Sequence, residues 1–193
     1  MTTWHWVRHG PTHEKSFVGW RDVPADLSDK AHIARVRAHL PDTALLVSSD
    51  LVRSTATADR LAGMAHKRLP HEHGLREIDF GIWDGMRFDA VAARDPELSR
   101  LFWEQPGDIR APDGESWNQT TARVNAVVDR LNTDHPDSHI IAVAHFGVIL
   151  TQVQRALAVT AYEAMAHKID NISVTTLYHD GGLWQAEQIN HMP

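Results

Sequence analysis

Three apolar runs in this chain each lead into a segment that carries a basic or imidazole side chain. Arg8-His9-Gly10 follows the alternating run that starts at Trp4, Arg53 lies shortly after a run ending at Ser48, and His145 follows a third run. Arginine can direct two N–H donors at phosphate oxygens, and a neutral histidine is a competent nucleophile near physiological pH. Together these residue types predict a site for a phosphate group.

Each of these residues also has an ordinary structural interpretation. An arginine in a first helical turn, such as Arg53, is most often a solvated surface residue. A histidine that follows a buried run, such as His145, is commonly a hydrogen-bonded core residue. Only their joint placement at the ends of predicted strands favours a functional site.

The elements that must position these residues follow from the alternation of β-branched apolar runs with helical patterns. This alternation predicts a three-layer α/β/α fold with a mostly parallel sheet of about six strands. The predicted strands lie near Trp4–Arg8, Ala44–Ser48, His71–Glu77, Ile140–Ala144, Val174–His179 and Trp184–Ile189. The last two flank Asp180-Gly181-Gly182 and predict a C-terminal antiparallel hairpin. Because ligands bind where the carboxyl ends of parallel strands meet, we expect Arg8, Arg53 and His145 at one edge.

Four helices are predicted from apolar residues at helical spacing. Their N-terminal caps are expected at Ser28, Asp50 and Ser116, and the fourth helix begins near Phe146. The first helix is expected to bury the face formed by Leu27, Ala31, Ala34 and Ala38. The turn-rich stretch 83–115 is predicted to leave the sheet and pass over the active-site edge. It either selects the substrate or is a surface insertion without a role.

Composition narrows the class of protein. A chain of 193 residues with 42% hydrophobic and 23% charged residues is expected to form one domain, residues 1–193. The absence of cysteine excludes disulfides and thiolate metal sites. No apolar run approaches the roughly 20 residues that span a bilayer, and no leader-like N-terminus is visible, so we expect a soluble cytoplasmic protein. The net charge of −6, with scattered basic residues, argues against a nucleic-acid partner.

The segment Arg8-His9-Gly10-Pro11-Thr12 resembles the signature of the histidine phosphatase superfamily, in the branch that includes cofactor-dependent phosphoglycerate mutases and related phosphatases. Further resembling segments follow in the family's order and span nearly the whole chain. They are Gly19-Trp20, Leu27-Ser28, residues 48–58, residues 76–85, residues 112–116 and residues 145–147. The segment 76–85 is also similar to that of α-ribazole-phosphate and broad-specificity phosphatases.

The resemblance implies a phosphoglycerate mutase-like fold and a covalent mechanism. His9 would attack the phosphorus in line and give a phosphohistidine that water later hydrolyses. Arg8, Arg53 and His145 would hold the phosphate oxygens. Glu77 would protonate the leaving alkoxide, for which a raised pKa is expected. Without the resemblance, Glu77 would be interpreted as a strand-end carboxylate paired with its neighbour Arg76.

Four residues are further candidates for phosphate or substrate binding: Gly10, Thr12, Lys15 and Phe146. Lys15 stands where many relatives have asparagine, and it either adds a cation or is a surface residue. Phe146 replaces a small residue, so the wall beside His145 is expected to be bulkier and more apolar. Other aromatic residues of the 83–115 stretch could add an apolar rim for a non-sugar leaving group.

The function predicted from these observations is hydrolysis of a small phosphorylated metabolite, without cofactor or metal. The alternative is a phosphoglycerate mutase, but mutase relatives carry paired arginines after the acid, and the region 85–112 has only isolated ones. A metallohydrolase is the second alternative, because the chain holds 14 histidines. Its dense groups, His71-Glu72-His73 and His135 with His139, lack the helical HExxH spacing. A non-catalytic binding protein is the third alternative, and the intact set of five catalytic candidates argues against it.

Overall fold

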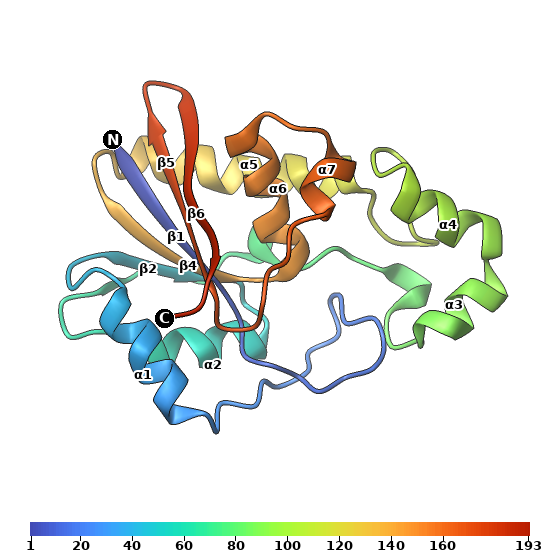
Figure 1. Ribbon diagram of the computed structural model, residues 1–193, viewed down its shortest axis with the longest axis horizontal. Helices are drawn as coiled ribbons and strands as arrows, with labels where there is room; N and C mark the ends of the chain where they lie inside the picture. Colours follow the sequence, from blue (N-terminus) through green and yellow to red (C-terminus); the bar gives the residue numbers. More distant parts are fainter.

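The computed structural model describes residues 1–193, which form one six-stranded sheet in the order β3-β2-β4-β1-β5-β6 (Figure 1). The strands are β1 (Thr2–Arg8), β2 (Leu45–Ser48), β3 (Lys67–Arg68), β4 (His139–Ala144), β5 (Val174–Asp180) and β6 (Leu183–His191). The first four pair in parallel, and β5 and β6 form the predicted antiparallel hairpin. The predicted mostly parallel sheet is therefore confirmed.

Strand register brings the predicted site residues together. Arg8 pairs with Ala144, and Ser48 pairs with Val143, so β1, β2 and β4 end at the same edge. The next residues along the chain, including His9 and His145, therefore leave the sheet side by side. The ring centroids of these two histidines lie 5.0 Å apart.

Helices cover both faces of the sheet and give it two apolar cores (Figure 1). The smaller core packs β1, β2 and β4 against α1 (Lys30–His39) and α2 (Val52–Leu61). The larger core lies on the opposite face, where Trp4 and Trp6 of β1 are fully buried. It is covered by α5 (Trp117–Asp134), α6 (Phe146–Leu157) and α7 (Ala161–Met165).

The stretch after residue 80 forms a helical excursion at one side of the sheet (Figure 1). It holds the short 3₁₀ helix η2 (Gly81–Trp83), then α3 (Phe88–Arg94) and α4 (Pro96–Glu104). Trp83, Val91 and Phe102 anchor it, because all three are buried in the larger core. The excursion is therefore packed onto the domain rather than tethered to it by a loop.

The predicted strand His71–Glu77 is wrong. The edge strand β3 is Lys67–Arg68, and residues 73–75 form the 3₁₀ helix η1 (His73–Leu75). The N–H groups of Lys67 and Leu69 donate to the carbonyls of Ala44 and Leu46, but the Ser48 carbonyl accepts from Glu72. The alternation would make His71 the donor to Ser48, so regular pairing ends after Leu69, and the chain leaves the sheet before most of the predicted strand.

Two details of the predicted helices also differ. The cap of α1 is Asp29, whose Oδ1 accepts a hydrogen bond from the His32 N–H at 3.0 Å, and not Ser28. The buried residues of α1 are His32, Ile33 and Val36 and not the alanines, and the two aliphatic side chains remove more apolar area from water than alanine does. The caps and starts predicted at Ser116 and Phe146 are confirmed.

Asp50 does not cap α2 either. Its carboxylate accepts two hydrogen bonds from the Arg76 guanidinium, both at 2.7 Å. The first N–H of α2, that of Val52, donates instead to Asp22 Oδ1 at 2.7 Å. An acceptor in a loop 30 residues earlier in the chain therefore binds the first N–H of the helix. Asp50 is free to bind Arg76 instead, next to Glu77.

Candidate active site

A cavity of about 290 Å³ opens beside the carboxyl end of β1. Its polar lining includes Arg8, His9, Thr12, Glu14, Ser16 and Glu77, and its apolar lining comprises Phe17, Val18, Phe80, Phe88, Trp103 and Phe146. Four separate regions contribute to it: the end of β1 with the loop that follows, the segment around Glu77, the α3–α4 excursion, and Phe146 at the start of α6. The cavity joins polar groups on one side to an aromatic wall on the other.

His9 is held with a defined proton distribution. Its Nδ1 lies 2.7 Å from the carbonyl oxygen of Gly10. A carbonyl can only accept a hydrogen bond, so Nδ1 carries the proton and Nε2 keeps its lone pair. The side-chain amide of Asn171 donates to the His9 carbonyl at 2.9 Å and fixes the backbone. His9 is 6% exposed, and that exposure is toward the cavity it lines.

Arg53 and His145 lie behind His9 and are fully buried. Arg53 Nε donates to His145 Nδ1 at 3.2 Å, so the neutral His145 ring carries its proton on Nε2, which lies 3.2 Å from the Ser54 hydroxyl. Both ring nitrogens of His145 are therefore already occupied. Arg53 also donates to the carbonyls of Gly19, at 2.6 Å, and Arg21, at 3.0 Å. Two of its five N–H groups have no acceptor in the protein, and neither Arg53 nor His145 is among the residues that line the cavity.

Arg8 lies at the cavity surface. Its Nη1 donates to the carbonyl of Ile169 at 2.7 Å, while its buried Nε has no hydrogen-bond partner in the protein. The guanidinium carbon lies 5.3 Å from the centroid of the Phe146 ring, within the range of a cation–π contact. Arg8 is thus oriented at both ends and retains donors that an anion could use.

Glu77 lines the same cavity. Its Oε1 accepts from the N–H of Ile78 at 3.0 Å, and the N–H of Gly147 lies 3.0 Å from Oε1 and 3.2 Å from Oε2. A Cβ atom at position 147 would lie 2.5 Å from Oε1, so only glycine allows the start of α6 to approach this closely. The helix terminus of α6 therefore orients the carboxylate.

Burial sets the protonation of the three titratable groups. Burial, followed by the charges of Arg53 and Arg8, lowers the pKa of His9 to about 3, although the hydrogen bond to the Gly10 carbonyl opposes them. The same causes hold the pKa of His145 well below its ordinary value. Burial raises the pKa of Glu77, although hydrogen bonds from Ile78 and Gly147 counteract it. A neutral imidazole thus shares the cavity with a carboxyl group whose pKa is raised above its ordinary value.

The other predicted contacts fall in different places. Thr12 and Phe146 line the cavity. The N–H of Gly10 donates to the Thr57 hydroxyl at 3.0 Å, so it is engaged within the protein. Lys15 is exposed and is not among the residues that line the cavity. Of the predicted aromatic rim, Phe88 and Trp103 line the cavity, whereas Trp83 and Phe102 are core residues.

Several residues that support the site were not predicted. Asn171 holds the His9 backbone, and Trp20 Nε1 donates to the Glu77 carbonyl at 2.8 Å. Arg123 on α5 and Glu115, two residues before α5, bind the segment around Glu77 and each other. Trp20 and Glu115 lie in two segments that resemble the family, Gly19-Trp20 and residues 112–116, but the resemblance assigned no structural role to either residue. Asn171 and Arg123 carry no such signal, because they act on backbone atoms.

The His71-Glu72-His73 group considered for a metal makes other contacts. His71 Nδ1 lies 3.1 Å from the Ser48 hydroxyl, and the His73 ring packs edge-on against Trp20. Since residues 71–77 are not a strand, the alternating arrangement expected to place both rings on one face does not arise. No group of three or more histidine or carboxylate side chains is arranged to hold a metal ion. No helix has the length and apolar character needed to cross a bilayer.

The family model described as "Histidine phosphatase superfamily (branch 1)" matches residues 5–192. Among curated relatives, the bifunctional protein Rv2228c of Mycobacterium tuberculosis is 32% identical over 166 residues, which are 85% of this chain and 43% of that protein. The chain therefore spans less than half the length of this relative.

Solved structures share the fold over nearly the whole chain. Bacillus stearothermophilus YhfR superposes with a TM-score of 0.90 at 23% identity, covering 100% of this chain and 98% of that one. A mycobacterial glucosyl-3-phosphoglycerate phosphatase superposes with a TM-score of 0.85 at 25% identity, covering 98% of each chain.

Proposed function

Because the chain belongs to branch 1 of the histidine phosphatase superfamily, we propose that it is a phosphomonoester hydrolase that acts through a phosphohistidine at His9. The observation that carries this proposal is the His9 tautomer. The Gly10 carbonyl fixes the proton on Nδ1, so Nε2 has a free lone pair in a cavity that also holds Arg8 and Glu77. The proposal is also supported by the mycobacterial glucosyl-3-phosphoglycerate phosphatase that shares this fold, because that protein is a phosphatase.

In the proposed first step, His9 Nε2 forms a bond to phosphorus while the ester P–O bond breaks. The proton of Glu77 passes to the departing oxygen, and Arg8 with the free N–H groups of Arg53 stabilises the charge on the transferring phosphoryl group. In the second step Glu77 accepts a proton from water, the water oxygen bonds to phosphorus, and the N–P bond breaks. His145 keeps Arg53 in place through its Nδ1 lone pair.

Hydrolysis fits the cavity better than mutase chemistry does. A mutase must also hold the carboxylate of a phosphoglycerate, which requires additional cations. Arg8 is the one cationic side chain that lines the cavity, and Glu14 adds a negative charge there. The charge of the lining therefore disfavours a substrate with a second acidic group close to the phosphate.

The test of this proposal is product analysis with 3-phosphoglycerate, a bisphosphate primer and simple phosphomonoesters. We expect release of inorganic phosphate from the monoesters and no isomerisation of 3-phosphoglycerate. Phosphoryl exchange between the two phosphoglycerates without net phosphate release would contradict hydrolysis and establish a mutase. Chelation of divalent ions is expected to leave phosphate release unchanged, and loss of activity restored by zinc would contradict the mechanism.

The aromatic wall predicts a preference for apolar or aryl leaving groups. Phe88 lines the cavity, is 60% exposed and stacks edge-on against Phe17, with ring centroids 4.7 Å apart. Phe88→Ala is expected to lower kcat/KM for 1-naphthyl phosphate by about 5- to 10-fold, since one aromatic contact contributes about 1 kcal/mol beyond its buried area. The value for glycerol phosphate should change by less than about twofold.

Tyr162→Ala is the matched control for this variant. Tyr162 is an aromatic residue of similar exposure, 61%, on α7 and outside the cavity lining. Its replacement should leave both substrates unaffected. Equal losses for naphthyl and glycerol phosphate in the Phe88 variant would show that this wall does not contact the leaving group.

A further inference from the structure

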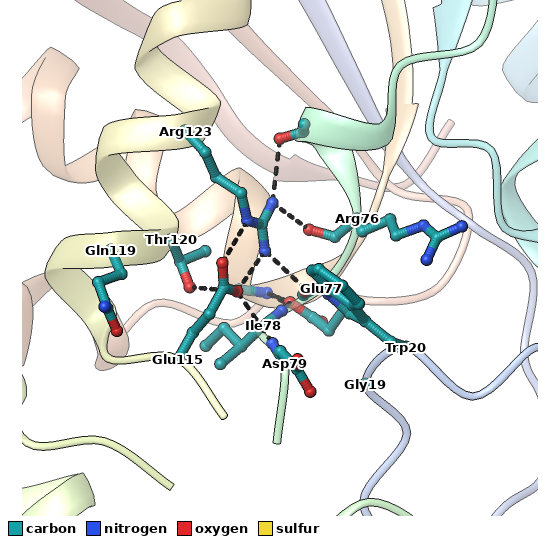
Figure 2. A network of polar contacts seen from close by, with 12 residues as sticks. Gly19, Trp20, Arg76, Glu77, Ile78, Asp79, Glu115, Gln119, Thr120 and Arg123 are labelled. Atoms are coloured by element: carbon teal, nitrogen blue, oxygen red, sulfur yellow. Dashed lines mark hydrogen bonds and ion pairs between the residues drawn. The ribbon is translucent and has the colours of Figure 1, made fainter. Parts of the chain in front are cut away.

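Glu77, the general acid proposed above, belongs to a segment without regular secondary structure. Glu77 lies between η1 and η2, where residues 76–80 form neither helix nor strand. The carbonyl groups of such a segment have no ladder partners, and buried carbonyls need donors from elsewhere. Figure 2 shows that these donors come from the side chain of Arg123 on α5.

Arg123 uses all five of its N–H groups on this segment and its support. Nη1 donates to the carbonyls of Gly74, at 3.0 Å, and Arg76, at 2.7 Å, and Nη2 donates to the carbonyl of Glu77 at 2.7 Å. The remaining two donors, Nε and Nη2, bind the Glu115 carboxylate at 2.8 and 2.7 Å. A lysine at this position has three donors on one atom and could not span these acceptors.

Glu115 completes the arrangement from the N-terminal side of α5 (Figure 2). Its Oε2 also accepts from the Asp79 N–H at 3.1 Å and the Thr120 hydroxyl at 3.2 Å. The side chains of Arg123 and Glu115 are 19% and 18% exposed, so the pair is largely removed from solvent screening. Although burial raises the pKa of Glu115, the bond to Arg123 brings it below the ordinary value, which keeps the pair charged.

The Glu77 carbonyl also accepts a hydrogen bond from the loop that Arg53 contacts. Trp20 Nε1 donates to this carbonyl at 2.8 Å. The residue before Trp20 is Gly19, whose carbonyl accepts a hydrogen bond from Arg53 at 2.6 Å. A Cβ atom at position 19 would lie 2.6 Å from the Ile78 carbonyl oxygen, so the two segments are in close contact. The backbone of the acid is thereby fixed between Arg53 and Arg123.

We propose that Arg123, held by Glu115, is a positioning residue that sets the Glu77 carboxyl group at the distance needed to protonate the leaving oxygen. This inference rests on the proposed function, because it assigns Arg123 no contact with substrate. Its effect on the reaction passes through Glu77 alone. Loss of the hydrogen bonds from Arg123 should therefore lower kcat/KM most for the leaving groups that most need a proton.

The test compares Arg123→Lys, Glu77→Gln and the double variant on two substrates. One is 4-nitrophenyl phosphate, whose acidic phenol leaves without protonation, and the other is an alkyl phosphate such as glycerol phosphate, whose alkoxide requires it. We expect Arg123→Lys to lower kcat/KM for the alkyl ester by about 30- to 100-fold and for the nitrophenyl ester by less than about fivefold, a part of the 10²–10⁴ that general acids contribute. In the Glu77→Gln background, adding Arg123→Lys should change neither value by more than about twofold, because the group it positions is already lost.

Arg130→Lys is the matched control, since Arg130 lies two turns further along α5, is 49% exposed and pairs with Glu72 and Asp134. It should behave as wild type. Equal losses on both substrates, or a further loss on top of Glu77→Gln, would overturn the positioning role and leave Arg123 as a purely structural residue. If Glu77→Gln itself shows no dependence on the leaving group, the proposed function fails instead.

A second variant keeps the proposal testable if Arg123→Lys does not fold, as judged by circular dichroism and thermal unfolding. Glu115→Gln retains the side-chain shape but weakens the hold on Arg123. It should shift the preference in the same direction, by about 3- to 10-fold, because a charge-assisted pair becomes a neutral hydrogen bond. An unchanged ratio of the two kcat/KM values in a folded Glu115→Gln variant would contradict the proposal.

Discussion

Replacing His9 with alanine is expected to lower kcat/KM for every phosphomonoester by about four orders of magnitude or more. The variant removes the only nitrogen lone pair that the hydrogen bonds leave free in the cavity. His145 cannot take over, because both of its ring nitrogens are occupied and its side chain is fully buried. Phosphate release should be measured at several substrate concentrations, because the loss is expected in kcat and not only in KM.

The control is His13→Ala, a histidine four residues further along the chain. Its side chain is 67% exposed and contacts Asp26 rather than the cavity. We expect near wild-type turnover from this variant and an unchanged far-ultraviolet circular dichroism spectrum from both. Turnover by folded His9→Ala within about tenfold of wild type would show that His9 is not the nucleophile.

Glu77→Gln is expected to produce the second largest loss, about 10²- to 10⁴-fold in kcat/KM for alkyl phosphates. Glutamine keeps the side-chain length and an acceptor for the N–H groups of Ile78 and Gly147, but it has no proton to give. Aryl phosphates with acidic phenols should lose much less. A uniform loss across leaving groups would contradict the assignment of Glu77 as the acid.

The pH dependence follows from the same residue. Burial raises the pKa of Glu77, and the reaction needs its protonated form, so kcat/KM for an alkyl ester should fall as pH rises through that raised pKa. His9, with a pKa lowered to about 3, stays neutral throughout this range and contributes no loss there. The Glu77→Gln profile should therefore lack the wild-type fall at higher pH. Persistence of that fall in the variant would assign it to another group.

The site edge could be predicted from the sequence because apolar runs fix strands, and parallel strands end together. Arg8, Arg53 and His145 each follow such a run, and the register of β1, β2 and β4 brings them to one place. The hairpin and the Ser116 cap were equally visible, since both depend on residues close together in the chain. Features that depend on neighbouring residues in the chain can therefore be predicted from the sequence.

Contacts between distant segments could not be predicted. Arg123 acts on carbonyl groups 46 to 49 residues away, and every residue type carries the same carbonyl. Asp22 satisfies the first N–H of α2 from 30 residues earlier, which releases Asp50 from the role of cap that its position indicates. The predicted strand His71–Glu77 is wrong for a local reason, because the two-residue alternation of N–H donors to β2 ends after Leu69.

The central claim, a covalent bond between His9 Nε2 and phosphorus, is tested most directly by trapping it. Wild-type protein turning over a phosphomonoester should be quenched within milliseconds at alkaline pH, digested and mapped by mass spectrometry. We expect an added phosphoryl group on the peptide that contains His9, localised to its ring and absent from His9→Ala. A phosphoryl group on another residue, or turnover without any phosphorylated protein, would contradict the mechanism.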